Sequence, residues 1–175
     1  HGYSCHVCVL RPLSRGHVRL ATADPMADPL IAGFLDRVET EEVVPYVPPV
    51  PDTVIADYYQ VIRQRFSNPE VADTTRRLCL DGSNRQPKFI IPSITDNLAR
   101  GVLPRGLILE SALWCRYCMG VTDSGQVIAP NDPNWDRLHS TARAAAADGQ
   151  LGCAGGEGLG FSPESASPRL CSVRP

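Results

Sequence analysis

The stretch "SNPEVADTTRRLCLDGSNRQPKFIIPSITDNLARG", residues 67–101, carries the densest helix signals in the chain. Asn68 followed by Pro69 is typical of a helix start, because Asn caps free backbone N–H groups and Pro fits the first helical position. Gly82 suits the left-handed conformation that ends many helices. The stretch therefore predicts a helix from Asn68 to the Asp-Gly pair, then a polar loop, then a shorter helix that stops at Gly101.

The same signals recur on both sides of this stretch. Four further helices are predicted over residues 28–43, 52–66, 104–120 and 131–149. The first two open with an aspartate cap, at Asp28 and Asp52. The third is apolar almost all round, which predicts a buried helix at the centre of the fold.

Apolar spacing supports the helices and argues against strands. In the second helix an apolar residue recurs every four positions, which predicts the buried face: Val54, Tyr58, Ile62 and Phe66. "KFIIP" at 88–92 has the composition of an extended segment, but its proline ends it. Because no segment alternates polar and apolar residues as a strand does, the sequence predicts an all-α fold of about six helices.

Bulk composition sets the class of protein. The chain has 175 residues, 43% of them hydrophobic, and a net charge of −2, which disfavours nucleic-acid binding. No apolar run approaches the roughly 20 residues that cross a bilayer, so no membrane partner is expected. Residues 24–149 are predicted to form the helical domain. Residues 1–23 are irregular, and residues 150–175, rich in Gly, Ser and Pro, are predicted to be a disordered tail.

The seven cysteines admit two interpretations. Their number is odd and their spacing irregular, which favours free thiols in the cytoplasm. Two CxxC pairs, Cys5–Cys8 and Cys115–Cys118, could instead close a tetrahedral zinc site. The second pair lies in the apolar helix, where cysteine behaves as a small hydrophobic residue, so no metal is predicted.

The polar loop after Gly82 concentrates hydrogen-bond donors. Arg77 precedes the loop, and Asn84, Arg85 and Lys88 follow within it. These side chains are either solvated or grip a ligand rich in hydroxyls or carboxylates, since Arg offers a planar fork of donors and Lys a movable one. Composition leaves both interpretations open.

From "RFSNPEVADTTRRLCLDGSNRQPKF" onward the sequence resembles the mannitol dehydrogenase family, the long-chain polyol dehydrogenases that include mannitol 2-dehydrogenases and fructuronate reductases. "MADPLIAGFLDRVETEEVVPYVP", "ALWCRYCMGVTDSGQ" and "NDPNWDRL" continue the likeness, which covers roughly residues 24–148. The resemblance implies a C-terminal, multi-helical substrate domain like that of 6-phosphogluconate dehydrogenase. It also implies that NAD is bound mainly by a separate N-terminal Rossmann domain, and that the substrate is a polyol, ketose or sugar acid.

The resemblance also implies roles for individual residues. The family motif is Lys, four residues, Asn, two residues, His; here His6 lies near the motif His, but Tyr3 stands where Asn is expected and the motif Lys would precede residue 1. Arg77 matches a family arginine beside the substrate, and Arg85 matches a basic residue that is often Lys. Asn84 and Lys88 stand beside them as further substrate-binding candidates.

Two functions follow as expectations. The first is the substrate domain of an NAD-dependent oxidoreductase that interconverts a polyol with a ketose, or an aldonate with a keto-acid such as fructuronate. The alternative is a truncated, non-catalytic helical remnant or interaction module. Because the resemblance fades at both ends, the chain is expected to be a truncation or frameshift product that is inactive alone.

Overall fold

The computed structural model describes residues 23–71 and 74–148. These residues form helices and turns, and no β-strand occurs among them apart from two isolated bridges, Val50 with Thr53 and Val121 with Val127. The predicted all-α, multi-helical fold is confirmed. The predicted tail, residues 150–175, and His6 lie outside the described residues, and the boundaries at 23/24 and 149/150 stay predictions.

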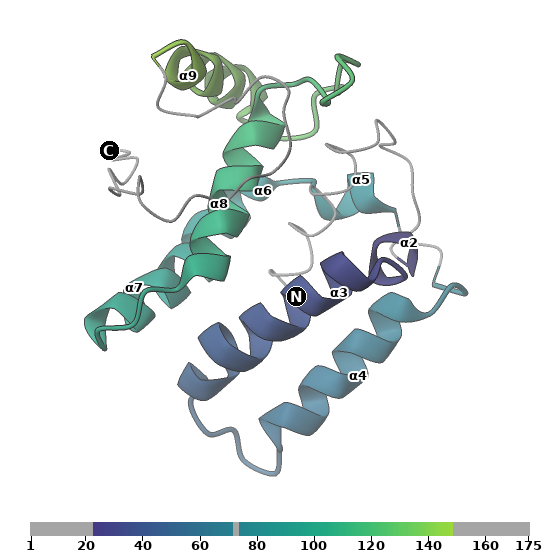
Figure 1. The fold of residues 1–175 in the computed structure, drawn as a ribbon, viewed down its shortest axis with the longest axis vertical. Coiled ribbons are helices and arrows are strands. Elements are labelled where there is room, and N and C mark those ends of the chain that lie inside the picture. The colour runs from purple at the N-terminus through teal and green to yellow at the C-terminus, as the bar shows by residue number, and fades with distance from the viewer. Residues whose placement is uncertain (1–22, 72–73, 149–175) are drawn as a thin grey trace.

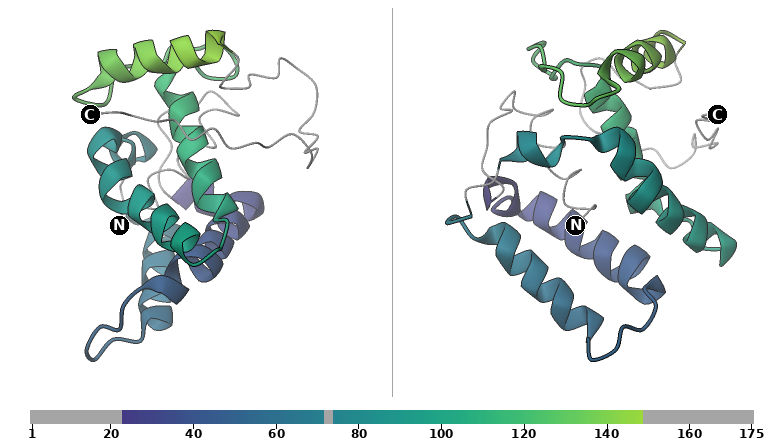
Figure 2. Two further views of the ribbon diagram at one scale, coloured as in Figure 1. Left: turned by 90° about the vertical axis from the view of Figure 1, so that its left-hand side faces the viewer. Right: turned by 180° about the vertical axis from the view of Figure 1, so that it is seen from behind.

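After the short α2 (Ala23–Met26), the helices α3 (Pro29–Arg37) and α4 (Ile55–Ser67) lie side by side (Figure 1, Figure 2). Asp28 caps α3 as predicted, because its carboxylate accepts the Leu30 N–H at 3.0 Å. Arg63 of α4 donates to the Asp36 carboxylate of α3 at 2.7 Å, which ties the two helices together. A π-helical turn, η1 (Val38–Val43), and a 3₁₀ turn, η2 (Val44–Tyr46), continue α3.

Two details predicted for α4 are wrong. Asp52 does not cap it; Asp52 sits in the preceding turn with φ 56°, and the helix begins after Val54. The buried face is centred on Tyr59, whereas Tyr58 is 50% exposed and Val54 64% exposed. A four-residue repeat drifts around a helix of 3.6 residues per turn, so it does not mark one face over 13 residues.

The helix predicted from Asn68 to Asp81 is also shorter than expected. Only α5 (Thr75–Leu78) is helical in this part, and Asn68 instead accepts the Glu70 N–H at 2.9 Å in a turn. After it come α6 (Gly82–Arg85), the π-helical η3 (Gln86–Ile90) and α7 (Ile91–Ala99). The "KFIIP" segment is therefore helical, not extended. Gly101 ends α7 with φ +77°, as predicted.

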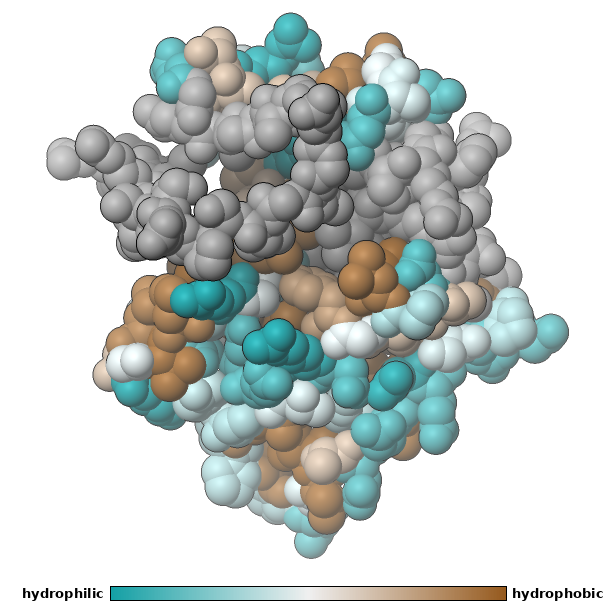
Figure 3. All heavy atoms as spheres, in the orientation of Figure 1, coloured by the Kyte–Doolittle hydropathy of each residue, from teal (hydrophilic) through white to brown (hydrophobic). Residues whose placement is uncertain are grey.

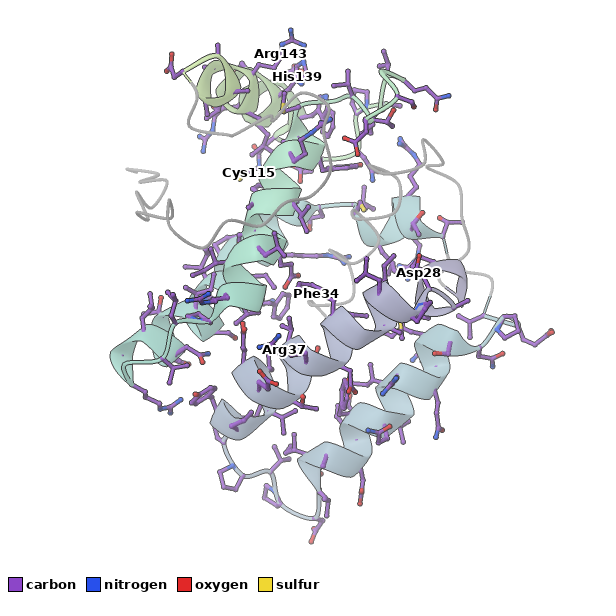
Figure 4. The ribbon with its side chains drawn as sticks, viewed as in Figure 1. Asp28, Phe34, Arg37, Cys115, His139 and Arg143 are labelled. Carbon is purple, nitrogen blue, oxygen red and sulfur yellow. The ribbon has the colours of Figure 1, made fainter. Side chains whose placement is uncertain are left out.

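α8 (Arg105–Cys118) runs through the centre of the fold, as predicted, and α9 (Trp135–Ala147) crosses its far end. The first turn of α8 packs in a core cluster with η1, η3 and α7. The last turn of α8 packs in a second cluster with α5 and α9. The first cluster is Val38, Val43, Ile90, Ile94 and Leu107; the second is Leu78, Cys79, Tyr117, Cys118, Ile128, Trp135 and Ala142. Phe34 points from α3 toward α8 and packs on the first cluster (Figure 4).

The start of α8 is fixed by a carboxylate from η1. Glu42 accepts the Gly106 N–H at 2.8 Å and the Leu107 N–H at 2.9 Å, two of the N–H groups that a helix start leaves unpaired. A Cβ at position 106 would overlap the Val38 side chain, so glycine allows this close approach. A negative charge at this end also suits the helix dipole.

The surface retains apolar patches. Brown atoms at the left edge of Figure 3 lie over the turn between α7 and α8, where Leu98, Val102 and Leu103 are exposed. Within the described residues, every helix is too short or too polar to cross a bilayer.

Candidate functional site

The candidate site is built on α5, where Arg76 and Arg77 follow one another. Thr74 caps this helix, and its Oγ1 accepts the Arg77 N–H at 3.2 Å. Successive residues of a helix point about 100° apart, so the two arginines face different surroundings. Arg76 is half-buried and turns toward the chain, whereas Arg77 is exposed.

The turn after α5 depends on Asp81 and Gly82. Asp81 adopts the left-handed conformation, with φ 63° and ψ 34°, and Gly82 begins α6. The prediction that Gly82 itself is left-handed is therefore wrong. Gly82 is needed for another reason, because a Cβ there would overlap the indole Nε1 of Trp114 on α8.

The turn brings Arg85 back to α5. Its Nη1 donates to the carbonyl oxygen of Leu78 at 3.2 Å, so the guanidinium lies against the end of the helix that carries Arg77. Asn84 is exposed beside it, and its Nδ2 donates to the Asp81 carboxylate. Arg77, Asn84 and Arg85 thus belong to one compact segment, although their roles in binding remain predictions.

The two remaining candidates predicted from the sequence are Lys88 and His6. Lys88 is exposed on η3, and its Nζ lies 5.4 Å from the centroid of the Phe89 ring. The ring belongs to the next residue in the chain, and the role of Lys88 in substrate binding stays a prediction. His6 falls outside the described residues, so its proposed catalytic role rests on the sequence alone.

Sequence reasoning missed residues 129–134, which back the candidate segment. Asn131 donates from Nδ2 to the Arg76 carbonyl oxygen at 2.7 Å, and Asp132 accepts the Ser83 N–H at 2.8 Å. The sequence feature at this place is the polar "NDPN" run, whose local pattern predicts a helix start. Its side chains instead reach a segment about 50 residues earlier in the chain, and local pattern does not reveal such a contact.

Two carboxyl groups interact between η1 and α8: Glu39 is half-buried, and Glu110 is buried. Burial, together with the neighbouring charge of Glu110, raises the pKa of Glu39 from 4.5 to about 7. Glu110 is 3% exposed in the middle of α8. A carboxyl group that titrates near neutral pH is a recognised feature of functional sites, but buried structural pairs show it as well.

The cysteines within the described residues favour packing over metal binding. Cys79, Cys115 and Cys118 are free thiols, as predicted for these three. Burial, then the nearby Cys115, raises the pKa of Cys118, which disfavours the thiolate that zinc requires. No group of three potential metal ligands converges in the described part of the chain. Cys5 and Cys8 lie outside it, so the zinc alternative stays untested.

The segment has the chemistry of an oxygen-binding surface. Guanidinium and amide donors suit hydroxyl and carboxylate oxygens, and the planar fork of Arg fixes their orientation. A dinucleotide normally binds where a strand runs through a glycine-rich loop into a helix. The described residues contain no strand, so they do not form such a cradle for NAD.

Comparison with known proteins gives a consistent result. The model of the mannitol dehydrogenase C-terminal domain matches residues 19–151. Mannitol 2-dehydrogenase of Cereibacter sphaeroides is 63% identical over 140 residues, which are 80% of this chain and 29% of that protein. The enzyme of the same name from Phaeosphaeria nodorum is 37% identical over 117 residues, 67% of this chain and 21% of that protein.

Solved structures agree with the sequence comparison. The structure of Pseudomonas fluorescens mannitol 2-dehydrogenase in ternary complex with NAD and D-mannitol matches with a TM-score of 0.77 and 31% identity, over 86% of this chain and 30% of that chain. Substrate-free D-sorbitol dehydrogenase shares the fold, with a TM-score of 0.70 at 17% identity over 79% of this chain. This chain thus spans less than a third of the length of these proteins. It belongs to the mannitol dehydrogenase family and carries that family's C-terminal domain.

Proposed function

We propose that this chain supplies the substrate-binding domain of an NAD-dependent dehydrogenase that interconverts a polyol such as D-mannitol with a ketose. The observation that carries the proposal is the fixed position of the Arg85 guanidinium on the Leu78 carbonyl, directly after Arg77. This bond ties Arg85 to the short helix that carries Arg77. The likeness to a solved enzyme bound to NAD and D-mannitol supports the class of ligand.

In this proposal the donors of the segment hold the substrate oxygens. Arg77 and Arg85 bind hydroxyl groups next to the reacting carbon, and Asn84 and Lys88 add donors at the margin. Oxidation removes a hydride from the carbinol carbon and a proton from its oxygen, and NAD, when bound, accepts the hydride. Orientation of the polyol relative to the cofactor is the contribution that this chain makes.

The cofactor and the proton acceptor come from outside the described residues. No strand-loop-helix cradle is formed by them, and Lys88, the only lysine of the chain, lies on η3. We therefore propose that turnover requires an added dinucleotide-binding domain and that the chain alone is inactive. The free thiols suit a reducing compartment, and we place the enzyme in the cytoplasm.

A sugar acid is the second candidate substrate. Two guanidinium groups on one segment suit a carboxylate at least as well as a hydroxyl, since charge-assisted hydrogen bonds are about twice as strong as neutral ones. The two arginines therefore suit this substrate class as well as a neutral polyol. Fructuronate reduction to the aldonate is the corresponding reaction.

The test combines this chain with the separately produced dinucleotide-binding domain of the Cereibacter sphaeroides enzyme and follows NADH oxidation with fructose or fructuronate. We expect activity only when both components are present, and its loss on Arg77→Ala. Arg143→Ala is the matched control, because Arg143 is exposed on α9 (Figure 4). Activity that survives Arg77→Ala unchanged would refute the proposed site. No activity with either substrate would favour a non-catalytic module.

A further inference from the structure

Two segments far apart in the sequence are joined by a set of hydrogen bonds. One is residues 76–85, from α5 to the end of α6, which we call the binding segment, and the other is residues 129–134, which we call the clamp. The bonds run in both directions: Arg76 Nη1 to Ala129 O (3.2 Å), Arg76 Nη2 to Pro130 O (3.0 Å), Asn131 Nδ2 to Arg76 O (2.7 Å), Ser83 N to Asp132 Oδ2 (2.8 Å) and Asn134 Nδ2 to Ser83 Oγ (3.0 Å).

The segment that carries the candidate site cannot hold its own shape. α5 and α6 have four residues each, far fewer than an isolated helix needs in water. The turn between them also contains a left-handed aspartate, Asp81. The orientation of this segment must therefore come from contacts with other parts of the fold.

The clamp supplies such contacts through Arg76 and Ser83, the residues directly before Arg77 and Asn84. The clamp hydrogen-bonds both the guanidinium and the carbonyl oxygen of Arg76. These bonds fix the rotation of α5 about the helix axis. Arg77, the next residue, then points outward. At the other end, Asp132 fixes the backbone of Ser83, two residues before Arg85.

We propose that the clamp holds the substrate-binding segment in register, with Asn131 and Asp132 as positioning residues for Arg77 and Arg85. This inference rests on the proposed function. Asp132 divides its carboxylate between two tasks: Oδ1 accepts the Asn134 N–H at 2.8 Å within its own loop, and Oδ2 accepts the Ser83 N–H. The second bond serves the binding segment and contributes nothing to the start of α9.

The test uses the full 175-residue chain and two readouts. The first is the guanidinium NMR signal of Arg85 without ligand, which reports its bond to the Leu78 carbonyl. The second is the affinity for D-mannitol, measured by titration. Asp132→Ala removes both acceptors, whereas Asp132→Asn keeps one carbonyl oxygen for Ser83. Asp136→Ala, at an exposed position on α9, and Ile94→Val, in the other core cluster, are the controls for charge and for general loss of stability.

We expect Asp132→Ala to speed exchange of the Arg85 guanidinium protons and to weaken mannitol binding about fivefold, the effect of a lost hydrogen bond that is partly compensated. Asp132→Asn should restore both readouts, and the two controls should leave them unchanged. An unaltered Arg85 signal in Asp132→Ala would overturn the clamp. A parent chain that binds no mannitol would count against the proposed function, while the Arg85 signal would still decide the clamp.

Discussion

At the scale of single residues, the candidate site depends on two arginines that are eight positions apart. Arg85 reaches the last carbonyl of the helix that carries Arg77. A guanidinium held by a backbone oxygen has a fixed plane, so part of the ordering entropy of ligand binding is already spent in the free protein.

Gly82 offers a direct test of the turn that creates this arrangement. Gly82→Ala should lower the free energy of unfolding by about 1–3 kcal/mol, because the added Cβ overlaps the Trp114 indole. Gly33→Ala is the matched control: its Cβ would meet nothing within 4 Å, and alanine should stabilise α3 by about 0.5–1 kcal/mol. Urea denaturation measures both. Equal stability of the two variants would contradict the close packing at Gly82.

Glu39 predicts a pH dependence of stability. Its folded-state pKa of about 7 lies above its ordinary value of 4.5, so between these values the folded protein holds a proton that the unfolded chain releases. Stability should therefore fall as pH rises from 4.5 to 7, by at most about 3 kcal/mol from this group. Glu39→Gln should flatten the curve, as followed by denaturation at pH 5 and pH 8. A slope that persists in Glu39→Gln would assign the effect to other groups.

Residue-level signals predicted the structure where the decisive contacts are local. Asp28 before Pro29 caps α3, because the N–H that it accepts is two residues away. Asp52 carries the same signal but lies in a turn with positive φ. The Asp81-Gly82 pair predicted a left-handed glycine, but Asp81 is the left-handed residue. Gly82 instead packs against Trp114, which lies 32 residues further along the chain.

At the scale of elements, α8 is positioned by the chain that precedes it. The Glu42 carboxylate spans the first two free N–H groups of this helix, and the Glu42 carbonyl oxygen accepts from Asn97 Nδ2 at 2.8 Å. One residue of η1 therefore sets both α7 and α8. Trp114 of α8 packs against Gly82 in the turn of the candidate site. The Glu42 bonds that position α8 therefore also support that site.

Glu42→Gln tests this support. The amide keeps one acceptor but loses the charge and the second hydrogen bond, so the free energy of unfolding should fall by about 1–3 kcal/mol. Glu41→Gln is the control, because Glu41 makes an exposed pair with Arg37, worth a few tenths of a kcal/mol. Thermal denaturation monitored by circular dichroism compares the two. A loss in Glu41→Gln as large as in Glu42→Gln would contradict the capping role.

Element prediction failed where tertiary contacts replace helix propensity. Asn68 and Pro69 predicted a long helix, but the chain forms a turn there. Among the described residues between this turn and Asp81, Thr75–Leu78 is helical. The bonds from the clamp to Arg76 and Ser83 stabilise this irregular course. They join positions 49–55 residues apart, and no local pattern encodes them.

At the scale of the whole molecule, two core clusters lie at opposite ends of α8, and Leu78 and Cys79 of the binding segment belong to the cluster at its last turn. The all-α fold and the family followed from helix signals and from motifs such as "DGSNRQPKF". The substrate did not, because hydroxyl and carboxylate oxygens call for the same donors. The chain also spans only 29% of the Cereibacter sphaeroides enzyme, so comparison with that enzyme does not decide the substrate of this chain.

The central claim is that Arg77 and Arg85 together bind the oxygens of a polyol or sugar acid. The most direct measurement is a titration of the ¹⁵N-labelled 175-residue chain with D-mannitol and with fructuronate, followed through its guanidinium signals. The account predicts that the Arg77 and Arg85 signals shift together with one dissociation constant, while the signal of Arg143 on α9 stays in place. Shifts of Arg143 alone, or of Arg77 and Arg85 with different dissociation constants, would contradict it.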